Sequence, residues 1–187
     1  MGEFSTIPLE EVEQFHQTTD VIVCGFGGAG GSAALEAAKA GAKVILYERA
    51  SGSGGSTGMS SCEMYLGGSG GTRLQKELGF SDSTENMIAY FDKALGERGD
   101  KDKIRLYAEG AADHFDWVES LGVTYKQAVM MDREVVPLSD ESLLFTGNER
   151  TNEFKAVAEP VPRGHVPSHE GDFGGRIFMD ALTNAVE

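Results

Sequence analysis

The stretch that decides the fold covers residues 20–48 and reads DVIVCGFGGAGGSAALEAAKAGAKVILYE. Its first apolar run, at residues 21–24, is typical of a buried parallel strand. The alanine-rich run at residues 32–39 favours a helix, and residues 43–47 favour a second apolar strand. Strand, glycine turn, helix and strand in this order predict a βαβ unit.

The turn between the first strand and the helix reads GFGGAG and fits the pattern G-x-G-x-x-G. Gly25 allows the tight turn, Gly27 lets a pyrophosphate approach the backbone, and Gly30 lets the helix pack closely on the sheet. The N-terminus of the helix that follows offers unpaired N–H groups and a partial positive charge to phosphates. The turn therefore predicts a dinucleotide-binding site.

An acidic residue ends the unit. Glu48 lies 23 residues after Gly25 and can accept hydrogen bonds from a ribose diol. Its charge disfavours the 2′-phosphate of NADP, although the neighbouring Arg49 weakens that inference. The pattern alone leaves FAD and NAD open. A flavodoxin-like βαβ unit that binds no ligand here is the alternative, but three spaced glycines at the turn need a reason, because glycine is a poor helix former.

Composition narrows the function classes. The chain has 187 residues, 40% of them hydrophobic, which suits about one domain with a real core. Sixteen basic and 30 acidic residues give a net charge of −14, which argues against nucleic acid or anionic membrane surfaces as partners. Two cysteines are no disulfide framework, and there is no Sec-type signal or membrane-length apolar run. A cytoplasmic location is expected.

The glycine- and serine-rich stretch at residues 50–72 follows the predicted unit. A flexible linker is expected to lack apolar anchors, yet this stretch carries Met59, Met64, Tyr65 and Leu66. We therefore expect an ordered loop close to a ligand, with a linker as the alternative.

The remaining chain is expected to be mostly helical, with an irregular middle. Apolar spacing and caps predict helices at residues 83–96, 102–121 and 176–186. Residues 123–136 suggest short irregular strands, and the prolines in residues 137–171 suggest a loop. In that loop Arg163 or His165 is a candidate contact for an anion, although a solvated histidine is the simpler expectation. His114 is expected to be a surface or packed residue, and Cys24 a small buried one.

Other catalytic patterns are absent from the sequence. The four histidines and two cysteines lack the spacing of metal ligands, so no metal site is predicted. There is no G-x-S-x-G elbow and no G-x-x-x-x-G-K-[ST] loop. The positive signal is cofactor binding, and no catalytic acid or base can be identified.

The segment after Glu48 carries a family resemblance. Glu48-Arg49-Ala50 followed by Gly54-Gly55-Ser56-Thr57 resembles the E-[KR]-x…G-G-[ST]-[ST] signature of the fumarate reductase and 3-ketosteroid dehydrogenase flavoproteins. The stretch YLGG at residues 65–68 is also similar to this family. The resemblance implies FAD as the cofactor, with this loop along its pyrophosphate and towards the flavin ring.

Later strings resemble one branch, the 3-ketosteroid 4-dehydrogenases that act on 5α-steroids. They are QKELGF at 75–80, HFDW at 114–117, LFTGNE at 144–149 and PRGH at 162–165. One departure stands out, because Ser61-Cys62 occupies the place where the family usually has two glycines. A thiol that tunes the flavin and a substituted packing position are both possible explanations of Cys62, of which packing is the simpler.

The resemblance implies a flavin-dependent oxidoreductase that removes a hydride and a proton from adjacent carbons of a steroid. A fumarate- or urocanate-type reductase acting on a dicarboxylate-like substrate, or a truncated FAD-binding module without turnover, are the alternatives. The residues that it assigns to FAD, together with those of the glycine turn, are Gly25, Gly27, Gly28, Ala29, Gly30, Glu48, Arg49, Ala50, Gly55, Ser56, Thr57, Ser60 and Ser61.

The predicted fold class is α/β, a Rossmann-like FAD-binding domain with a parallel sheet and flanking helices. Residues 1–19 are expected to be a leader that packs on the domain or stays mobile, and residues 20–187 the N-terminal portion of the FAD-binding domain. One βαβ unit leaves the parallel sheet short of strands, and the last predicted helix runs to the end of the sequence without a glycine cap. The fold is therefore expected to be incomplete, with the capping domain and the catalytic residues in a further part of the same polypeptide.

Overall fold

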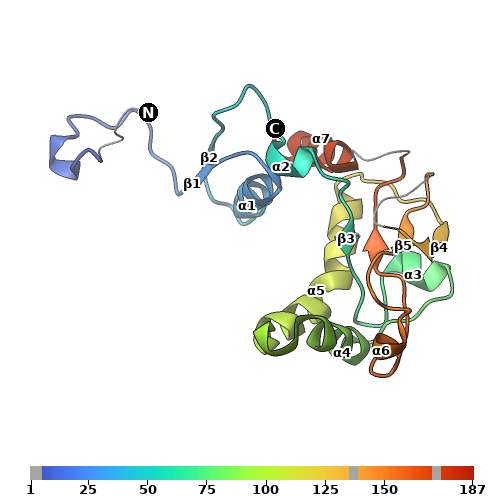
Figure 1. Ribbon diagram of the computed structural model, residues 1–187. Coiled ribbons are helices and arrows are strands. Elements are labelled where there is room, and N and C mark those ends of the chain that lie inside the picture. Colours follow the sequence, from blue (N-terminus) through green and yellow to red (C-terminus); the bar gives the residue numbers. More distant parts are fainter. Residues whose placement is uncertain (1–5, 135–138, 170–173) are drawn as a thin grey trace.

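The computed structural model describes residues 6–134, 139–169 and 174–187 (Figure 1). Residues 135–136 of the expected irregular strands, and residues 137–138 and 170–171 of the expected loop, lie outside these ranges. The helices and strands are η1 (Leu9–Glu11), β1 (Val21–Cys24), α1 (Gly28–Lys39), β2 (Val44–Tyr47), α2 (Gly55–Gly58), β3 (Met64–Tyr65), α3 (Arg73–Glu77), α4 (Thr84–Leu95), η2 (Gly96–Arg98), α5 (Lys101–Ser120), β4 (Val129–Arg133), β5 (Leu143–Phe145), α6 (Asn152–Lys155), β6 (Gly164–His165) and α7 (Gly174–Val186).

The predicted βαβ unit is confirmed. Strands β1 and β2 pair in parallel, with Val21 opposite Val44 and Cys24 opposite Tyr47. Helix α1 connects them but begins at Gly28, four residues before the expected start at Ser32. The first turn of α1 was not predicted because its glycines have low helix propensity. Tertiary packing favours the helix there instead.

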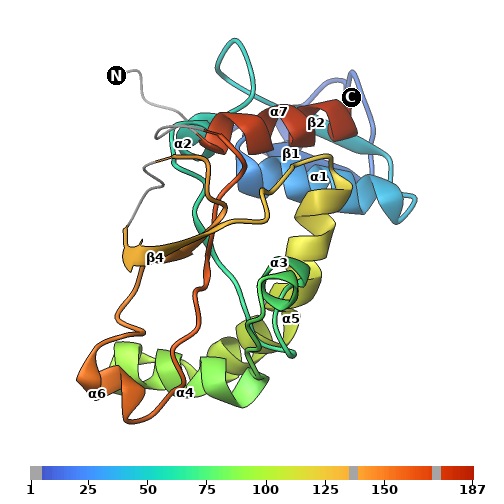
Figure 2. The ribbon, with the colours of Figure 1, turned by 90° about the vertical axis from the view of Figure 1, so that its right-hand side faces the viewer.

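Helix α7 closes one side of this unit. Figure 2 shows α7 beside α1, with α4 and α6 at the opposite end of the molecule and α5 running between the two ends. A Cβ atom on Gly31 of α1 would lie 2.7 Å from the Leu182 side chain of α7, so a larger residue at position 31 would displace that side chain. Phe178, Met179 and Leu182 of α7 are buried in one core with residues of α1 and α5.

The predicted helices at residues 83–96 and 102–121 are α4 and α5. Ser83 caps α4 by accepting from the N–H of Asn86, at 3.1 Å. Asp100 caps α5 by accepting from the N–H groups of Asp102 and Lys103. Both helices contribute buried residues to a second core, in which Met87 and Phe115 are fully enclosed.

The expectation of a loop over residues 137–171 was wrong for part of that range. A four-stranded sheet in the order β3-β6-β5-β4 uses residues 143–145 and 164–165, and helix α6 lies between them. The short strands carry no readable alternation, because β5 is buried at all three positions. Pro160 and Pro162 precede β6 without interrupting its pairing with β3 and β5.

Residues 50–72 form an ordered segment, as expected. It contains α2 and β3, and Leu66 is almost completely buried. The linker alternative is therefore wrong. A capping box formed by Thr72 and Gln75 starts the short helix α3, which the sequence analysis did not predict.

The prediction that Cys24 is buried was wrong. Cys24 is an exposed free thiol, and its neighbour Ile22 on the same strand face is 62% exposed. One face of the β1–β2 sheet is covered by α1, whereas the other carries these side chains towards solvent. The leader reaches the sheet through Thr19, whose hydroxyl donates to the carbonyl of Lys43, while Ile7 and Leu9 remain exposed.

Candidate cofactor site

Two glycine turns meet at the carboxyl ends of β1 and β2. Gly25 has φ of +101°, and its N–H donates to the carbonyl of Tyr47 at 2.7 Å. The N–H of Gly54 donates to the carbonyl of Phe26 at 2.8 Å, and Gly27 and Gly54 form a parallel bridge. This bridge joins the predicted fingerprint turn to the start of α2.

The second and third glycines of the fingerprint, Gly27 and Gly30, differ in the space around them. A Cβ atom on Gly30 would lie 1.9 Å from the carbonyl oxygen of Gly25, so no side chain fits there. A Cβ atom on Gly27 would find Gly54 O as its nearest neighbour, at 3.7 Å. Packing against the main chain therefore requires glycine at position 30. At position 27 a methyl group would fit within the chain itself, so the space beside that residue is free.

The start of α1 offers backbone donors. Gly27 caps the helix without a side-chain acceptor, and the N–H of Gly28 donates to Thr57 Oγ1 at 3.2 Å. Helix geometry leaves the N–H groups of Ala29 and Gly30 without an acceptor inside the helix. The positive end of the helix dipole and these donors suit a phosphate group.

Glu48 joins the first glycine turn to the start of the segment that leads to the second turn. Its Oε2 accepts from the N–H of Phe26 and its Oε1 from the N–H of Ala50, both at 2.6 Å. The hydrogen bond from Ala50, followed by that from Phe26, lowers the pKa of Glu48 below its ordinary value. The exposed carboxylate is therefore ionised at neutral pH and keeps lone pairs for further donors such as ribose hydroxyls.

The remaining predicted residues lie on and after α2. Gly55, Ser56 and Thr57 form its first turn, with Ser56 exposed. The Ser60 hydroxyl donates to the carbonyl of Thr57 at 2.8 Å. A Cβ atom on Gly174 would lie 2.5 Å from the carbonyl oxygen of Ser61, so the two main chains are in close contact.

Gly174 and Gly175 bring the start of α7 close to the main chain of this segment. The N–H of Gly175 donates to Ser60 O at 2.9 Å, and a Cβ atom on Gly175 would lie 1.9 Å from Thr57 O. Arg49 and Ala50 are exposed beside Glu48. The structure thus gathers all the predicted cofactor residues around the two glycine turns and the start of α7.

One cation beside the turns, Arg176, was not predicted from the sequence. Arg176, in the first turn of α7, places Nη1 3.4 Å from the carbonyl oxygen of Ser53, and its Nη2 pairs with Asp180 at 2.7 Å. Arg176 was not predicted to lie here because it is far from the fingerprint in the sequence. Its position directly after the glycine pair was the available signal.

Cys62 is a core residue with an unusual backbone. Its φ of 59° lies in the left-handed region that favours glycine. The side chain is buried in the core with Val118 and Met179, and burial raises the pKa of the thiol to about 11. These observations support the packing explanation of the Ser61-Cys62 departure.

Arg163 and His165 are not solvated loop residues, so that expectation was wrong. Both are fully buried, and Arg163 forms a two-pronged ion pair with Asp82 through Nε at 2.6 Å and Nη2 at 2.8 Å. The anion that Arg163 contacts is therefore an internal carboxylate. His114, as expected, is a surface residue, and it stacks on Trp117.

Within residues 6–134, 139–169 and 174–187, no group of three or more His, Cys, Asp or Glu side chains is arranged to hold a metal ion. None of the helices in this part of the chain is both long and apolar enough to cross a membrane.

Comparison with known families decides the cofactor. A family model described as FAD binding domain matches residues 20–173. The chain belongs to the FAD binding domain family. Its cofactor is FAD, and the structure fits this group: Gly27 leaves room beside its backbone, α1 presents free N–H groups, and Glu48 is ionised. The α/β architecture is the one expected for this domain.

Relatives of this FAD binding domain are oxidoreductases. The 3-oxo-5-alpha-steroid 4-dehydrogenase of Comamonas testosteroni is 29% identical over 95% of this chain and 33% of its own length. A crystal structure of the 3-ketosteroid-delta4-(5alpha)-dehydrogenase from Rhodococcus jostii RHA1 in complex with 4-androstene-3,17-dione superposes with a TM-score of 0.89. It is 39% identical, over 95% of this chain and 38% of that chain.

Fumarate reductases are further relatives. The probable fumarate reductase Ifc3 of Shewanella frigidimarina is 40% identical over 57% of this chain and 18% of its own length. The open conformation of a flavocytochrome c3 fumarate reductase gives a TM-score of 0.67 at 31% identity, over 91% of this chain and 25% of that chain. The chain thus spans about a third of the length of the steroid dehydrogenases that it matches, and less of the fumarate reductases.

Proposed function

We propose that the chain is the cofactor-binding portion of an FAD-dependent 3-ketosteroid dehydrogenase. The observation that carries this proposal is the likeness to the Rhodococcus ketosteroid dehydrogenase, at 39% identity and a TM-score of 0.89 over 95% of the chain. Bound FAD supplies the oxidising chemistry, by accepting the hydride removed from the steroid. The substrate is a small molecule, a 3-ketosteroid, and the catalytic acid or base lies in a further part of the polypeptide.

The chain's own residues bind and orient the cofactor in this proposal. The N–H groups of Ala29 and Gly30 and the dipole of α1 hold the pyrophosphate. Glu48 accepts hydrogen bonds from the adenosine ribose, and Arg49 and Ala50 follow it along the same edge. Because the domain carries −14 overall, fixed backbone dipoles rather than the total field must hold the anionic cofactor.

The second glycine turn extends this cofactor site in the proposal. Gly55, Ser56 and Thr57 line the path from the pyrophosphate towards the flavin, and Ser60 and Ser61 lie further along it. Backbone N–H groups and hydroxyls at these positions suit phosphate oxygens and flavin heteroatoms.

The proposed organisation and location follow from the same features. Residues 1–19 form a leader, and residues 20–187 form the N-terminal portion of the FAD-binding domain. The free thiols of Cys24 and Cys62 support a reducing, cytoplasmic location. The likeness to fumarate reductases supports one second candidate, a reductase that acts on a dicarboxylate-like substrate through the same cofactor site.

A glycine substitution tests the cofactor site without disturbing the fold. Gly27 has φ of −92°, and its nearest clash partner would be 3.7 Å away, so Gly27→Ala fits the chain itself. We expect its free energy of unfolding to stay within about 0.5 kcal/mol of the natural chain. Titration with FAD, followed by flavin fluorescence, should show at least about a tenfold weaker affinity, because a methyl group blocks pyrophosphate approach. Unchanged affinity would contradict the proposed site.

Reaction direction separates the candidate functions. The full polypeptide that contains this chain, loaded with FAD, is mixed anaerobically with a 3-oxo-5α-steroid, and flavin absorbance is recorded. Bleaching by the steroid supports the dehydrogenase. After chemical reduction of the flavin, reoxidation by fumarate but not by the unsaturated steroid favours the reductase. Bound flavin that responds to neither compound would favour a non-catalytic FAD-binding module.

A further inference from the structure

Residues 60–62, here called the Ser60 turn, carry an unusual backbone conformation. Cys62 has φ of 59°, in the left-handed region that residues other than glycine rarely adopt. In the part of the chain that the structure describes, Ser69, with φ of 51°, is the other non-glycine residue in this region. At both positions a further interaction is needed to offset the steric cost of the backbone.

Hydroxyl groups supply that interaction at both positions. The N–H of Cys62 donates to Ser60 Oγ at 3.1 Å, and the N–H of Ser69 donates to Thr84 Oγ1 at 3.1 Å. The Ser60 hydroxyl in turn donates to the carbonyl of Thr57 at 2.8 Å. It therefore links α2 to the left-handed residue, and its single proton is already used within the chain.

The C-terminus of α5 shows a similar turn with glycine at the left-handed position. The Ser120 hydroxyl donates to the carbonyl of Trp117, three residues before it, at 2.6 Å. Two residues after Ser120, Gly122 has φ of 100°, and its N–H donates to the carbonyl of Glu119 at 2.9 Å. Glycine reaches the left-handed region without steric cost, so this turn does not depend on a serine hydroxyl.

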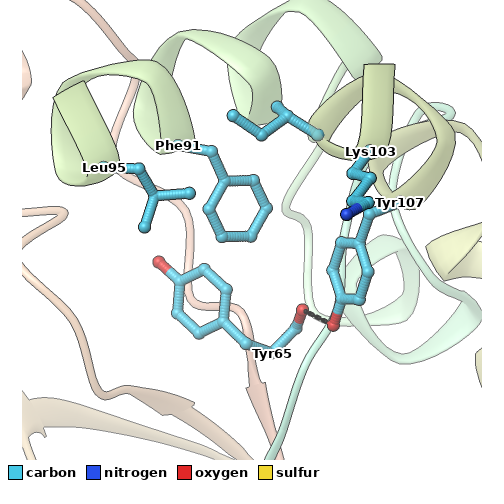
Figure 3. Close-up of a pocket in the computed structure, with 6 residues that line it drawn as sticks. Tyr65, Phe91, Leu95, Lys103 and Tyr107 are labelled. Atoms are coloured by element: carbon cyan, nitrogen blue, oxygen red, sulfur yellow. Dashed lines mark hydrogen bonds between the residues drawn. The ribbon is translucent and has the colours of Figure 1, made fainter. Parts of the chain in front are cut away.

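Contacts on both sides hold the ends of the Ser60 turn. On one side, the N–H of Gly175 donates to the carbonyl of Ser60 at 2.9 Å. On the other side the chain enters β3, where the Tyr107 hydroxyl donates to the carbonyl of Tyr65 at 2.9 Å, the dashed line in Figure 3. Because both ends are held, the backbone conformation of the turn decides where the main chain of Ser61 lies.

We propose that Ser60 is a positioning residue for FAD, whose hydroxyl stabilises the left-handed conformation of Cys62 and thereby fixes the main chain of Ser61 beside the flavin. The hydroxyl acts through the turn and makes no contact of its own with the cofactor. This inference rests on the proposed course of FAD along residues 55–61.

Loss of the hydroxyl should release the turn. Without its acceptor, Cys62 shifts towards the right-handed and extended conformations that cost it less. Only the molecules that keep the left-handed turn then bind FAD at full strength, so the apparent affinity falls with their fraction. A glycine at position 62 removes the steric cost and, with it, the need for the hydroxyl.

A double-mutant cycle in the full polypeptide that contains this chain tests this role. Ser60→Ala should weaken FAD binding about fivefold, measured by flavin fluorescence. In a Cys62→Gly background the same substitution should weaken binding by less than about twofold, because glycine keeps the turn unaided. An equal loss in both backgrounds would overturn the proposal in favour of a direct contact between the Ser60 hydroxyl and FAD.

Two further variants separate positioning from a general loss of stability. Ser60→Thr keeps the hydroxyl and should retain the natural affinity and the natural visible spectrum of the bound flavin. Ser60→Ala should shift that spectrum at saturating FAD, because the surroundings of the ring change with Ser61. Ser120→Ala is the matched control, since it removes an exposed hydroxyl that also donates to a carbonyl three residues before it, and it should change neither quantity.

Three results would count against the positioning role: Ser60→Thr as weak as Ser60→Ala, a natural spectrum in Ser60→Ala, or an equal loss in Ser120→Ala. Gly27→Ala distinguishes failure of this inference from failure of the proposed cofactor site. If Gly27→Ala weakens FAD binding and Ser60→Ala does not, the cofactor site stands and the role of Ser60 is excluded. If neither variant changes FAD affinity, the proposed course of FAD is wrong and the role of Ser60 fails with it.

Discussion

The glycine turns and the interior around Arg163 hold the chain together in opposite ways. The turns are built from main-chain contacts between residues 25–30 and residues 54–57, and the carboxylate that fastens them, Glu48, is exposed. The second region, here called the buried polar cluster, is built from side chains. Its members are almost completely enclosed: Thr72, Gln75, Asp82, Arg163 and His165.

This difference teaches where each region is vulnerable. In the turns, a substitution is harmful when the new side chain does not fit, since a Cβ atom on Gly30 would lie 1.9 Å from a main-chain oxygen. In the buried polar cluster, a substitution is harmful when it leaves a polar group without a partner, since the side chains of Arg163 and Asp82 have no exposed surface. Removing one partner there leaves a charge buried without compensation. The following substitutions test this contrast.

The largest expected effect comes from the buried ion pair. Arg163→Leu leaves Asp82 unpaired in the interior, and we expect a loss of about 3–5 kcal/mol in the free energy of unfolding. Arg105→Leu is the control, because its pair with Glu109 is 3.6 Å long and exposed, and should cost less than about 1 kcal/mol. Urea unfolding followed by circular dichroism measures both. Similar losses would remove the contrast between buried and surface pairs.

The next effect is a pH dependence set by His165. Its Nδ1 lies 2.8 Å from the carbonyl oxygen of Arg163, so Nδ1 carries the proton, and Nε2 accepts from the Thr72 hydroxyl. Burial lowers the pKa of His165 from 6.5 to about 4. The unfolded chain therefore binds the proton more tightly. The stability contribution is complete above pH 6.5 and is lost as pH falls towards 4, by about 3 kcal/mol in total.

Unfolding titrations between pH 7.5 and pH 4.5 measure this dependence. His165→Gln should be less stable at neutral pH but should lose less stability on acidification. Glu63, whose pKa burial raises, acts in the opposite direction and is the same in both chains. An identical acid slope in the two chains would exclude His165 as its source.

A smaller effect is expected at the turns. Gly30→Ala forces the main chain of Gly25 to move, and we expect it to cost about 1–3 kcal/mol of unfolding free energy and to weaken FAD binding. Gly110→Ala is the matched control, since Gly110 lies inside α5 with no atom within 4 Å of the added methyl group. It should stabilise the chain by up to about 1 kcal/mol. Thermal unfolding with and without FAD measures both, and a harmless Gly30→Ala would contradict the steric argument.

The smallest effect concerns the cation that the sequence analysis missed. Arg176→Gln removes a guanidinium beside the Gly54 turn, where an exposed charge contributes modestly to holding an anion. We expect FAD affinity to fall about threefold at low salt and the difference to shrink in high salt. Arg105→Gln, on the exposed face of α5, is the control and should leave FAD affinity unchanged. An affinity loss that is the same at all salt concentrations would point to a structural rather than an electrostatic role.

Helices and caps were the features best predicted from sequence. The helix at residues 83–96 was readable because a cap and an apolar face lie within a few neighbouring residues. Strands β5 and β6 were missed because they are two or three residues long and fully buried, so they show neither alternation nor turn chemistry of their own. The prediction for Cys24 was wrong because an apolar strand sequence indicates one packed face of the strand. It does not show that the other face, which carries Cys24, is exposed to solvent.

By itself, the sequence determined the βαβ unit, the roles of Gly25 and Gly30, and the acidic residue that follows the second strand. These features depend on hydrophobic period, steric size and turn chemistry, which act over a few residues. Tertiary structure alone decided that the Gly27 and Gly54 turns meet, that Arg176 lies beside them, and that Arg163 is enclosed with Asp82, 81 residues away in the chain. Such pairings arise because packing buries apolar surface from distant segments, and each buried polar group must then find its partner among the residues that packing brings close.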